Sequence, residues 1–355
     1  MKYAWTTLWI IVFASVEFGC QKEKKADPLT IPEWKWEWEL HCTPMGDSEV
    51  DNITVNPKDD SLWFVTSMNG LYVTFNGGSS WQKPFSACTY ALEIDPNDPS
   101  RIFVGSGNEM YLSTDYGHNW THINSFPATI YSILVSKIDN SVYVCLGWGE
   151  SVTANGIFKS SDMGKTWTEY LYNIREKGLI PWDIEEDSLN HKLYIATEIF
   201  NHPQPYHPPF LRSSDGGITW EDISGTSLWW HVIKIQVHPL THDVYVQTEG
   251  AGLFSSSDFG DHWQYLENQF SEVFIIDKNN PQIFWGGNHT YGNYVKLSGG
   301  VYLSKDNGDN FKLVGLSGLI VTGLCLNRNS TSLYVASYNS GIFVFKLLAG
   351  SPPDH

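Results

Sequence analysis

The stretch Ser113-Thr114-Asp115-Tyr116-Gly117-His118-Asn119-Trp120 occurs, with small changes, six times along the chain. Residues 160–167, 213–220 and 256–263 keep its Ser, Asp, Gly and Trp positions. Residues 74–81 have Thr74 in place of Ser and Asn76 in place of Asp, and residues 304–311 have Phe311 in place of Trp. The third residues of the copies are Asn76, Asp115, Asp162, Asp215, Asp258 and Asp306, so the steps between them are 39, 47, 53, 43 and 48 residues. A period of this size predicts a repeat architecture.

The octapeptide has the composition of a tight turn between two strands. Gly117 supplies a positive φ without steric cost. Asp115 and the Ser113 hydroxyl can accept hydrogen bonds from nearby backbone N–H groups. Trp120 opens the next strand and offers a large apolar face for packing. The aspartate positions of all six copies are therefore expected to be structural and not catalytic.

The segments before each octapeptide are typical of β-strands. In one repeat, residues 92–96 alternate and end at a proline, and residues 101–104 and 110–112 are rich in aromatic and branched side chains. The other repeats follow the same order. We expect four short strands per repeat, A to D, with the octapeptide in the C–D turn.

A seventh repeat is incomplete at both ends of the chain. Residues 321–345 supply strands A, B and C and no octapeptide, and residues 34–40 form an isolated strand of the D type. Pairing residues 34–40 with residues 341–345 would complete the blade and hide the open edges. The sequence predicts an all-β fold: a seven-bladed β-propeller of four-stranded antiparallel blades, one domain at residues 32–348, with a C-terminal tail at 349–355.

The octapeptide pattern resembles the Asp box, also called the bacterial neuraminidase repeat. The superfamily that carries it includes sialidases, xyloglucanases, sortilin-type receptors and photosystem II assembly factors. The resemblance implies the propeller fold and does not choose among these functions. Sialidases use a triad of arginines, and the four arginines here are not arranged in that way: Arg101, Arg175, Arg212 and Arg328.

The N-terminus has the form of a targeting segment. Residues 1–19 combine Lys2 with a short apolar core, too short for a membrane span, which is typical of a signal peptide. Cys20 at its end resembles a lipidation site of bacterial lipoproteins, and residues 20–31 would then form a flexible tether. We expect a cell-envelope protein held to a membrane by this lipid alone, and plain secretion is the alternative.

Composition excludes one class of partner and leaves one thiol pair open. The net charge of −17 and the absence of a basic stripe argue against nucleic-acid binding. Cys42 and Cys88 precede neighbouring A strands and form either a disulfide or two thiols.

Aromatic and histidine side chains gather in the D–A and B–C loops of the expected blades 3 to 6. Such loops carry the binding sites of many scaffolds, and flat aromatic rings suit sugars or peptide side chains. We therefore predict a ligand-binding rim, with loop-to-loop packing of the same rings as the alternative. The rim residues are Trp148, Trp182, His202, Tyr206, Trp229, Trp230, His231 and Tyr291.

Aligning the A strands gives a second set of residues at the channel mouth: Asp51, Tyr90, Tyr131, Trp182, Ile233, Glu272 and Thr322. Asp51 and Glu272 are the candidate catalytic pair if the chain is a xyloglucanase-like glycoside hydrolase. Glu93 and Glu185 are expected to point inward below them. The alternative is that these carboxylates simply line a wet channel, and xyloglucanases resemble two facing propellers where this chain has one.

The sequence favours a non-catalytic binding or scaffold module over an enzyme. Its expected partner is a glycan or an envelope protein or peptide, and the protein is expected to be a monomer. His202, His207 and His231 could together hold zinc, but the proline-rich loop around the first two favours no metal site. We expect no cofactor. The identity of the ligand stays open.

Overall fold

The computed structural model describes residues 36–41, 50–147, 154–170, 178–199, 208–225, 228, 231–248, 251–266, 273–288, 299–338 and 340–347, without the side chains of residues 36, 37, 288 and 347. This part of the chain contains 28 β-strands. Within it, no helix is long and apolar enough to cross a membrane.

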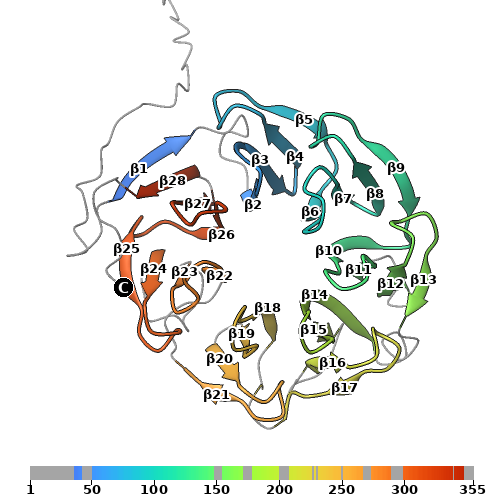
Figure 1. The fold of residues 1–355 in the computed structure, drawn as a ribbon. Coiled ribbons are helices and arrows are strands. Elements are labelled where there is room, and N and C mark those ends of the chain that lie inside the picture. Colours follow the sequence, from blue (N-terminus) through green and yellow to red (C-terminus); the bar gives the residue numbers. More distant parts are fainter. Residues whose placement is uncertain are drawn as a thin grey trace, which may run out of the picture.

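All strands pair with antiparallel neighbours, and the sheets are arranged around a centre (Figure 1). One eight-stranded sheet contains β2 (Val50–Asn56), β3 (Asp59–Ser67), β4 (Gly70–Thr74), β5 (Gln82–Phe85), β6 (Thr89–Ile94), β7 (Ile102–Ser106), β8 (Glu109–Ser113) and β9 (Thr121–Ser125). Its two halves are joined by a single residue pair, Ser67 with Thr89.

Four four-stranded sheets follow in chain order. They contain β10 (Thr129–Val135), β11 (Val142–Gly147), β12 (Gly156–Ser160) and β13 (Thr168–Tyr170); β14 (Leu179–Asp187), β15 (Lys192–Ile199), β16 (Leu211–Ser213) and β17 (Glu221–Asp222); β18 (Val232–Val237), β19 (Val244–Thr248), β20 (Gly252–Ser256) and β21 (Gln264–Tyr265); and β22 (Val273–Ile276), β23 (Phe284–Asn288), β24 (Gly300–Ser304) and β25 (Lys312–Gly315). In each, the first strand lies nearest the centre and the fourth lies at the periphery (Figure 1).

The last sheet joins the two ends of the described chain. It contains β26 (Val321–Leu326), β27 (Ser332–Ser337), β28 (Gly341–Leu347) and, as its outer strand, β1 (Trp36–His41). The predicted pairing is present: β1 runs antiparallel to β28, with Trp36 opposite Leu347 and His41 opposite Ile342. Trp38 stacks on Phe345 with 4.0 Å between ring centroids. The unpaired outer edge of β28 is thereby covered.

The core lies between neighbouring sheets. The second strands are buried on both faces, which explains their nearly continuous aromatic and branched sequences. Tyr143 and Cys145 of β11, for example, form one buried cluster with Leu193 and Ile195 of β15. The outer strands are mostly exposed, so the apolar signal weakens toward the periphery.

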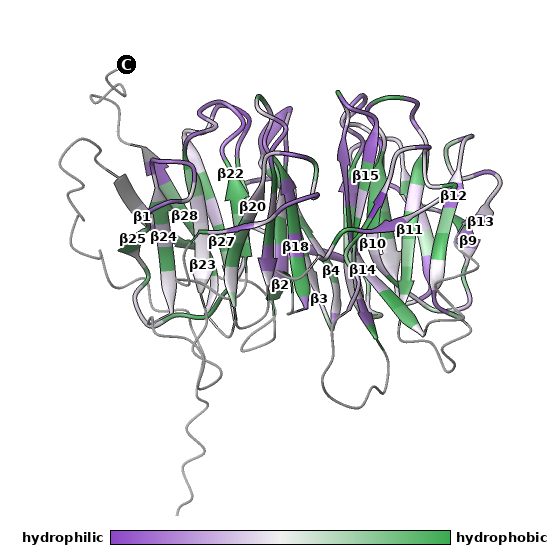
Figure 2. Ribbon diagram, turned by 90° about the horizontal axis from the view of Figure 1, so that it is seen from below, coloured by the Kyte–Doolittle hydropathy of each residue, from purple (hydrophilic) through white to green (hydrophobic). Residues whose placement is uncertain are grey.

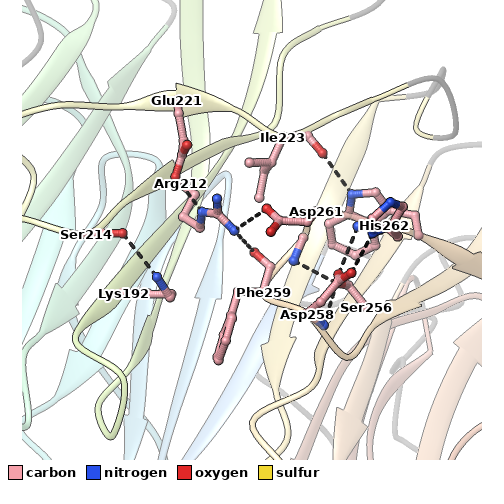
Figure 3. A network of polar contacts seen from close by, with 12 residues as sticks. Lys192, Arg212, Ser214, Glu221, Ile223, Ser256, Asp258, Phe259, Asp261 and His262 are labelled. Carbon is pink, nitrogen blue, oxygen red and sulfur yellow. Dashed lines mark hydrogen bonds and ion pairs between the residues drawn. The ribbon is translucent and has the colours of Figure 1, made fainter.

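Each octapeptide folds as the same hydrogen-bonded turn, shown for residues 256–263 in Figure 3. The Ser256 hydroxyl donates to Asp258 and accepts the Gly260 N–H at 2.7 Å. The Asp258 carboxylate also accepts a hydrogen bond from the backbone N–H of His262 at 2.9 Å. The backbone and ring donors of His262 lower the pKa of Asp258 to about 2. Gly260 has a φ of 101°, and a Cβ at this position would lie 2.4 Å from Ile223, so the turn needs glycine here.

The two described arginines of the octapeptide-bearing sheets tie turns together. Arg212 donates to Glu221, Asp261 and the Phe259 carbonyl, joining two neighbouring octapeptide turns (Figure 3). Arg101 pairs with the buried Asp95 at 2.7 Å. Both guanidinium groups are engaged in structural pairs.

The turns between first and second strands, called inner turns below, are linked from sheet to sheet. Asn97 donates to Asn140, and Glu186 accepts from Ser136 Oγ at 2.6 Å and from Lys137 N at 2.8 Å. The remaining links are Asn56 to the Pro99 carbonyl, His242 to Asp187, His238 to the Pro281 carbonyl, Ser330 to Asp277, Asn279 to the Arg328 carbonyl, and Asn327 to Asp60. The last of these joins the β26–β28 sheet to β3, so the links run through every neighbouring pair.

The strands run between two different faces. Val142 pairs with both Val135 and Ser160, so the inner turns and octapeptide turns share one face, called the turn face. In Figure 2 hydrophilic residues gather on these turns along the upper edge. The opposite face is called the loop face. Trp36 lies beside Leu347, next to the inner turn that precedes Ser332, so the described chain begins at the turn face.

Candidate functional site

Six of the inner strands carry a β-bulge near the loop face. The pairing of first with second strands skips one residue in each of these six strands, and the skipped residues are Asp51, Tyr90, Tyr131, Trp182, Ile233 and Thr322. They are six of the seven residues that the sequence alignment put at the channel mouth, and the seventh, Glu272, lies outside the described residues. Bulges re-aim side chains and occur beside functional sites.

Four rings from neighbouring sheets form a continuous series, called the aromatic arc: Tyr90, Tyr131, Trp182 and His231. Tyr90 and Tyr131 stack at 5.0 Å with 9° between their planes. Tyr131 and Trp182 stack at 4.8 Å and 26°. His231 meets Trp182 edge-on at 5.8 Å and 76°. All four are half-buried, so the arc presents a surface.

Stacking decides what the arc can offer to a ligand. Both faces of Tyr131 are covered, one by Tyr90 and one by Trp182. A sugar ring recognised by stacking needs an open ring face. Ring edges are positively polarised and carry O–H and N–H donors, which suit peptide carbonyls and carboxylates. The geometry of the arc therefore fits a polypeptide better than a sugar.

The surroundings of the arc hold its rings in place. Gly147, at the end of β11, has no room for a side chain, since a Cβ there would lie 2.5 Å from Ile180 and 3.2 Å from Tyr131. Burial, followed by the charges of Cys88 and Glu198, raises the pKa of Tyr131 to about 12. The phenol is therefore a neutral donor at physiological pH. Burial likewise raises the pKa of the Cys88 thiol.

Below the arc, charged side chains of the inner strands face the channel. Lys234 Nζ lies 3.2 Å from both carboxylate oxygens of Asp183, which also accepts the Ile235 N–H. Burial, then the charge of Glu185, raises the pKa of Glu93 to about 8. Burial also raises the pKa of Glu185. The Lys234 side chain is 35% exposed.

Only part of the predicted rim can be placed. Trp182 and His231 come together in the arc. The other six predicted rim residues lie outside the described residues: Trp148, His202, Tyr206, Trp229, Trp230 and Tyr291. The candidate acid Glu272 and the candidate lipidation site Cys20 also lie outside them.

The thiol and metal predictions can be compared with the described residues alone. Cys88 is a free cysteine, which is the alternative to a disulfide with Cys42, and Cys42 lies outside those residues. No group of three His, Cys, Asp or Glu side chains in the described chain could hold a metal ion.

Sequence reasoning did not assign Tyr90 and Tyr131 to the ligand site, although it aligned them with Trp182. The available signal was their shared position before each inner strand. The Asp183–Lys234 pair was also missed, because the bulge shifts the alternation by one residue and hides which side chains face the channel.

Comparison with known proteins gives one sequence match. Residues 157–170 match the repeat family described as BNR-Asp box repeat. This segment holds one complete octapeptide, so the match agrees with the resemblance drawn from the sequence. By sequence, the chain matches no curated protein.

Solved structures give a broader likeness. The GH74 xyloglucanase from Xanthomonas campestris is similar over 89% of this chain, with 12% identity and a TM-score of 0.70. YCF48 bound to D1 peptide is similar over 89% of this chain, with 12% identity and a TM-score of 0.62. The extracellular domain of the putative hybrid two component system BT4673 from B. thetaiotaomicron is similar over 88%, with 15% identity and a TM-score of 0.63.

These likenesses show the fold alone. The chain spans 55% of the xyloglucanase, 97% of YCF48 and 39% of the BT4673 domain. The sheets are thus arranged as in propeller proteins that include both a glycoside hydrolase and a peptide-bound protein. The fold is an all-β propeller-like assembly of four-stranded antiparallel units.

Proposed function

We propose that this protein is a non-catalytic binding module of a bacterial cell envelope, and that it binds a polypeptide partner through the aromatic arc. The observation that carries the proposal is the stacking of Tyr90, Tyr131 and Trp182, which covers ring faces and leaves edges and polar atoms for contact. Rigid aromatic side chains give large contact areas at small entropic cost.

The proposed scaffold is a seven-bladed ring closed by β1. Counting the halves of the eight-stranded sheet as two blades gives seven four-stranded units. The pairing of β1 with β28 and the inner-turn link from Asn327 to Asp60 support closure. The propeller domain would span residues 32–348.

The proposed location is a bacterial membrane surface, with the signal peptide of residues 1–19 removed and Cys20 lipidated. This rests on the sequence pattern described above, since residues 1–35 lie outside the described chain. The chain would act as a monomer without a cofactor.

A glycoside hydrolase is the second candidate. It is supported by the likeness to the xyloglucanase and by carboxylates at the channel, of which Asp51 lies on a bulge of β2. Sugar release from β-glucans that disappears in Asp51→Asn would establish it and overturn the binding module. If the protein is a binding module, a glycan is the alternative ligand to a polypeptide.

The test is a peptide array and a glycan array probed with the wild type and two variants. Trp182→Ala removes the centre of the arc, and Tyr265→Ala removes a 47% exposed ring from the outer strand β21. We expect at least a tenfold loss of peptide affinity for Trp182→Ala and less than a twofold change for Tyr265→Ala. Equal binding by both variants would remove the arc from the site.

A further inference from the structure

Four aliphatic side chains stand exposed on the turn face. Ile138, Leu189 and Leu240 occupy three consecutive inner turns and are 41%, 67% and 72% exposed. Ile218, in the octapeptide of the β14–β17 sheet, is 68% exposed. These four residues are called the aliphatic patch. Exposed aliphatic groups of this size that cluster on one face mark an interaction site.

The turns themselves do not require these residue types. In six inner turns, the N–H of this position bonds to the side chain two residues earlier, whether the residue is aliphatic, such as Ile138, or polar, such as Asn97. Asn97 and Asn279 then use their side chains to bridge to the next inner turn. The aliphatic members replace such a bridging amide with a side chain that points into solvent.

The octapeptide shows the same contrast. The residue that follows its glycine is Ser79, His118, Lys165, Ile218, Asp261 or Asp309 in the six copies. Ile218 is the aliphatic exception, and it belongs to the sheet at the middle of the three inner turns. The hydrogen bonding of the turns therefore explains neither the aliphatic residues of the inner turns nor Ile218.

The four side chains lie on three neighbouring sheets of the turn face. A cavity of about 240 Å³ between the first two sheets is lined by Ile138, by His191 and Lys192 of the inner turn that contains Leu189, and by residues 214–216 near Ile218 in the chain. His242 lies 2.8 Å from Asp187 and connects the turn of Leu240 to the turn of Leu189. The aliphatic side chains therefore share one face, with polar groups between them.

The chain outside the structure leads to this same face. Trp36 lies at the turn face, and 15 residues separate it from Cys20. Fully extended, they reach at most about 50 Å. A lipid on Cys20 would therefore be joined to the turn face through this tether, within about 50 Å of it.

Charged groups of both signs surround the patch. Arg212 pairs with Glu221 and Asp261. Lys192 donates to Ser214, and the Asp139 carboxylate next to Ile138 is 51% exposed. Because the whole chain carries −17, the attraction must come from apolar insertion and does not need anionic lipid.

We propose that the aliphatic patch rests in the headgroup layer of the bilayer to which the chain is anchored, so that the aromatic arc faces away from the membrane. This inference rests on the proposed lipid anchor. It adds an orientation: the arc is presented to partners on the far side of the protein.

The test labels single cysteines in the lipidated full chain on phosphatidylcholine vesicles. Leu189→Cys and Leu240→Cys are reacted with a water-soluble maleimide before and after cleavage at a protease site inserted after Lys25, and the wild type gives the background from native thiols. We expect labelling to be at least tenfold slower before release. Met68→Cys, 50% exposed in the turn between β3 and β4 on the loop face, should change less than twofold.

The outcomes separate the orientation from the anchor. Detergent-phase partitioning of the wild type and Cys20→Ser reports the anchor by itself. The proposal is overturned if the chain is anchored and release changes the labelling at neither position. It is also overturned if the two positions are protected in native membranes but not in pure lipid vesicles, because the patch would then contact a protein. If the chain is not lipidated, it is added to preformed vesicles, where slower labelling supports the patch and unchanged labelling overturns it.

Discussion

Replacing Glu93 by glutamine tests the charge arrangement inside the channel. Glu93 lies on the inner strand β6, with Glu185 raising its pKa further after burial, and with Lys278, Lys137 and Lys234 acting in the opposite direction. The amide fits this position, since Gln236 occupies the equivalent place two residues before the inner turn of β18. Glu93→Gln therefore removes the titration while keeping the shape.

The expected effect on stability has a definite sign. The pKa of Glu93 is about 8 in the native state and 4.5 in the unfolded chain. Between these two pH values the native protein holds the proton and the unfolded chain has released it. Stability from this group is therefore highest below pH 4.5 and is lost as the pH rises toward 8. The difference sets an upper bound of about 5 kcal/mol, at about 1.36 kcal/mol per pKa unit. Because the Glu93 side chain is only half-buried, solvent screens the group, and we expect roughly 3 kcal/mol.

The assay is urea unfolding of the wild type and Glu93→Gln between pH 5 and pH 9. The free energy of unfolding of the wild type should fall more steeply with pH, and the variant should be the more stable protein at pH 9. Glu109→Gln is the control, because hydrogen bonding from Ser125 lowers the pKa of Glu109. Its carboxyl group therefore titrates below the range of the assay, and the removal of this titration should not change the slope between pH 5 and pH 9. Parallel curves for the wild type and Glu93→Gln would refute the reasoning.

Two further substitutions test the fold. Trp38→Ala removes the ring stacked on Phe345, so the pairing of β1 with β28 loses a large side chain. It should cost about 3–5 kcal/mol of unfolding free energy in a urea titration, and an unchanged midpoint would contradict closure through β1. Ser160→Ala leaves the buried Gly164 N–H without its 2.7 Å acceptor and should cost about 1–3 kcal/mol while peptide affinity stays within twofold; lost affinity at unchanged stability would place the ligand on the turn face.

The repeat could be predicted from the sequence because its signal is local. Ser113, Asp115 and Gly117 contact one another within five residues, so the octapeptide carries its own turn. The pairing of β1 with β28 was also accessible, since each strand lacked a partner in the pattern. Both inferences depend on chemistry that a short stretch of chain contains.

The links between inner turns were not accessible in this way. They use an asparagine in one turn, a glutamate in the next and a histidine in another, each bonded to a residue at least 39 positions away. No residue type is common to these links, so the sequence does not indicate where they form. Their partners are set by the angle between neighbouring sheets, which the sequence pattern does not encode.

The shared position of the arc residues was predictable, and their bulges and stacking were not. The alignment put Tyr90, Tyr131 and Trp182 at one position before the inner strands, and in the structure each of them is a bulge residue. It could not show that their rings stack, because stacking depends on the distance between inner strands. That distance is short only where residues such as Gly147 leave no side chain in the way.

The position of the arc on inner-strand bulges bears on how it would bind. Tyr131 and Trp182 are fixed by paired strands on either side and by their own stacking, so binding would require little further ordering of these side chains. A site held in this way keeps its geometry when the surrounding loops differ. Affinity for a polypeptide would then depend on the arc, and selection among partners would fall to the loops that surround it. Trp182→Ala should accordingly weaken every peptide that binds, whereas loop substitutions should change which peptides bind.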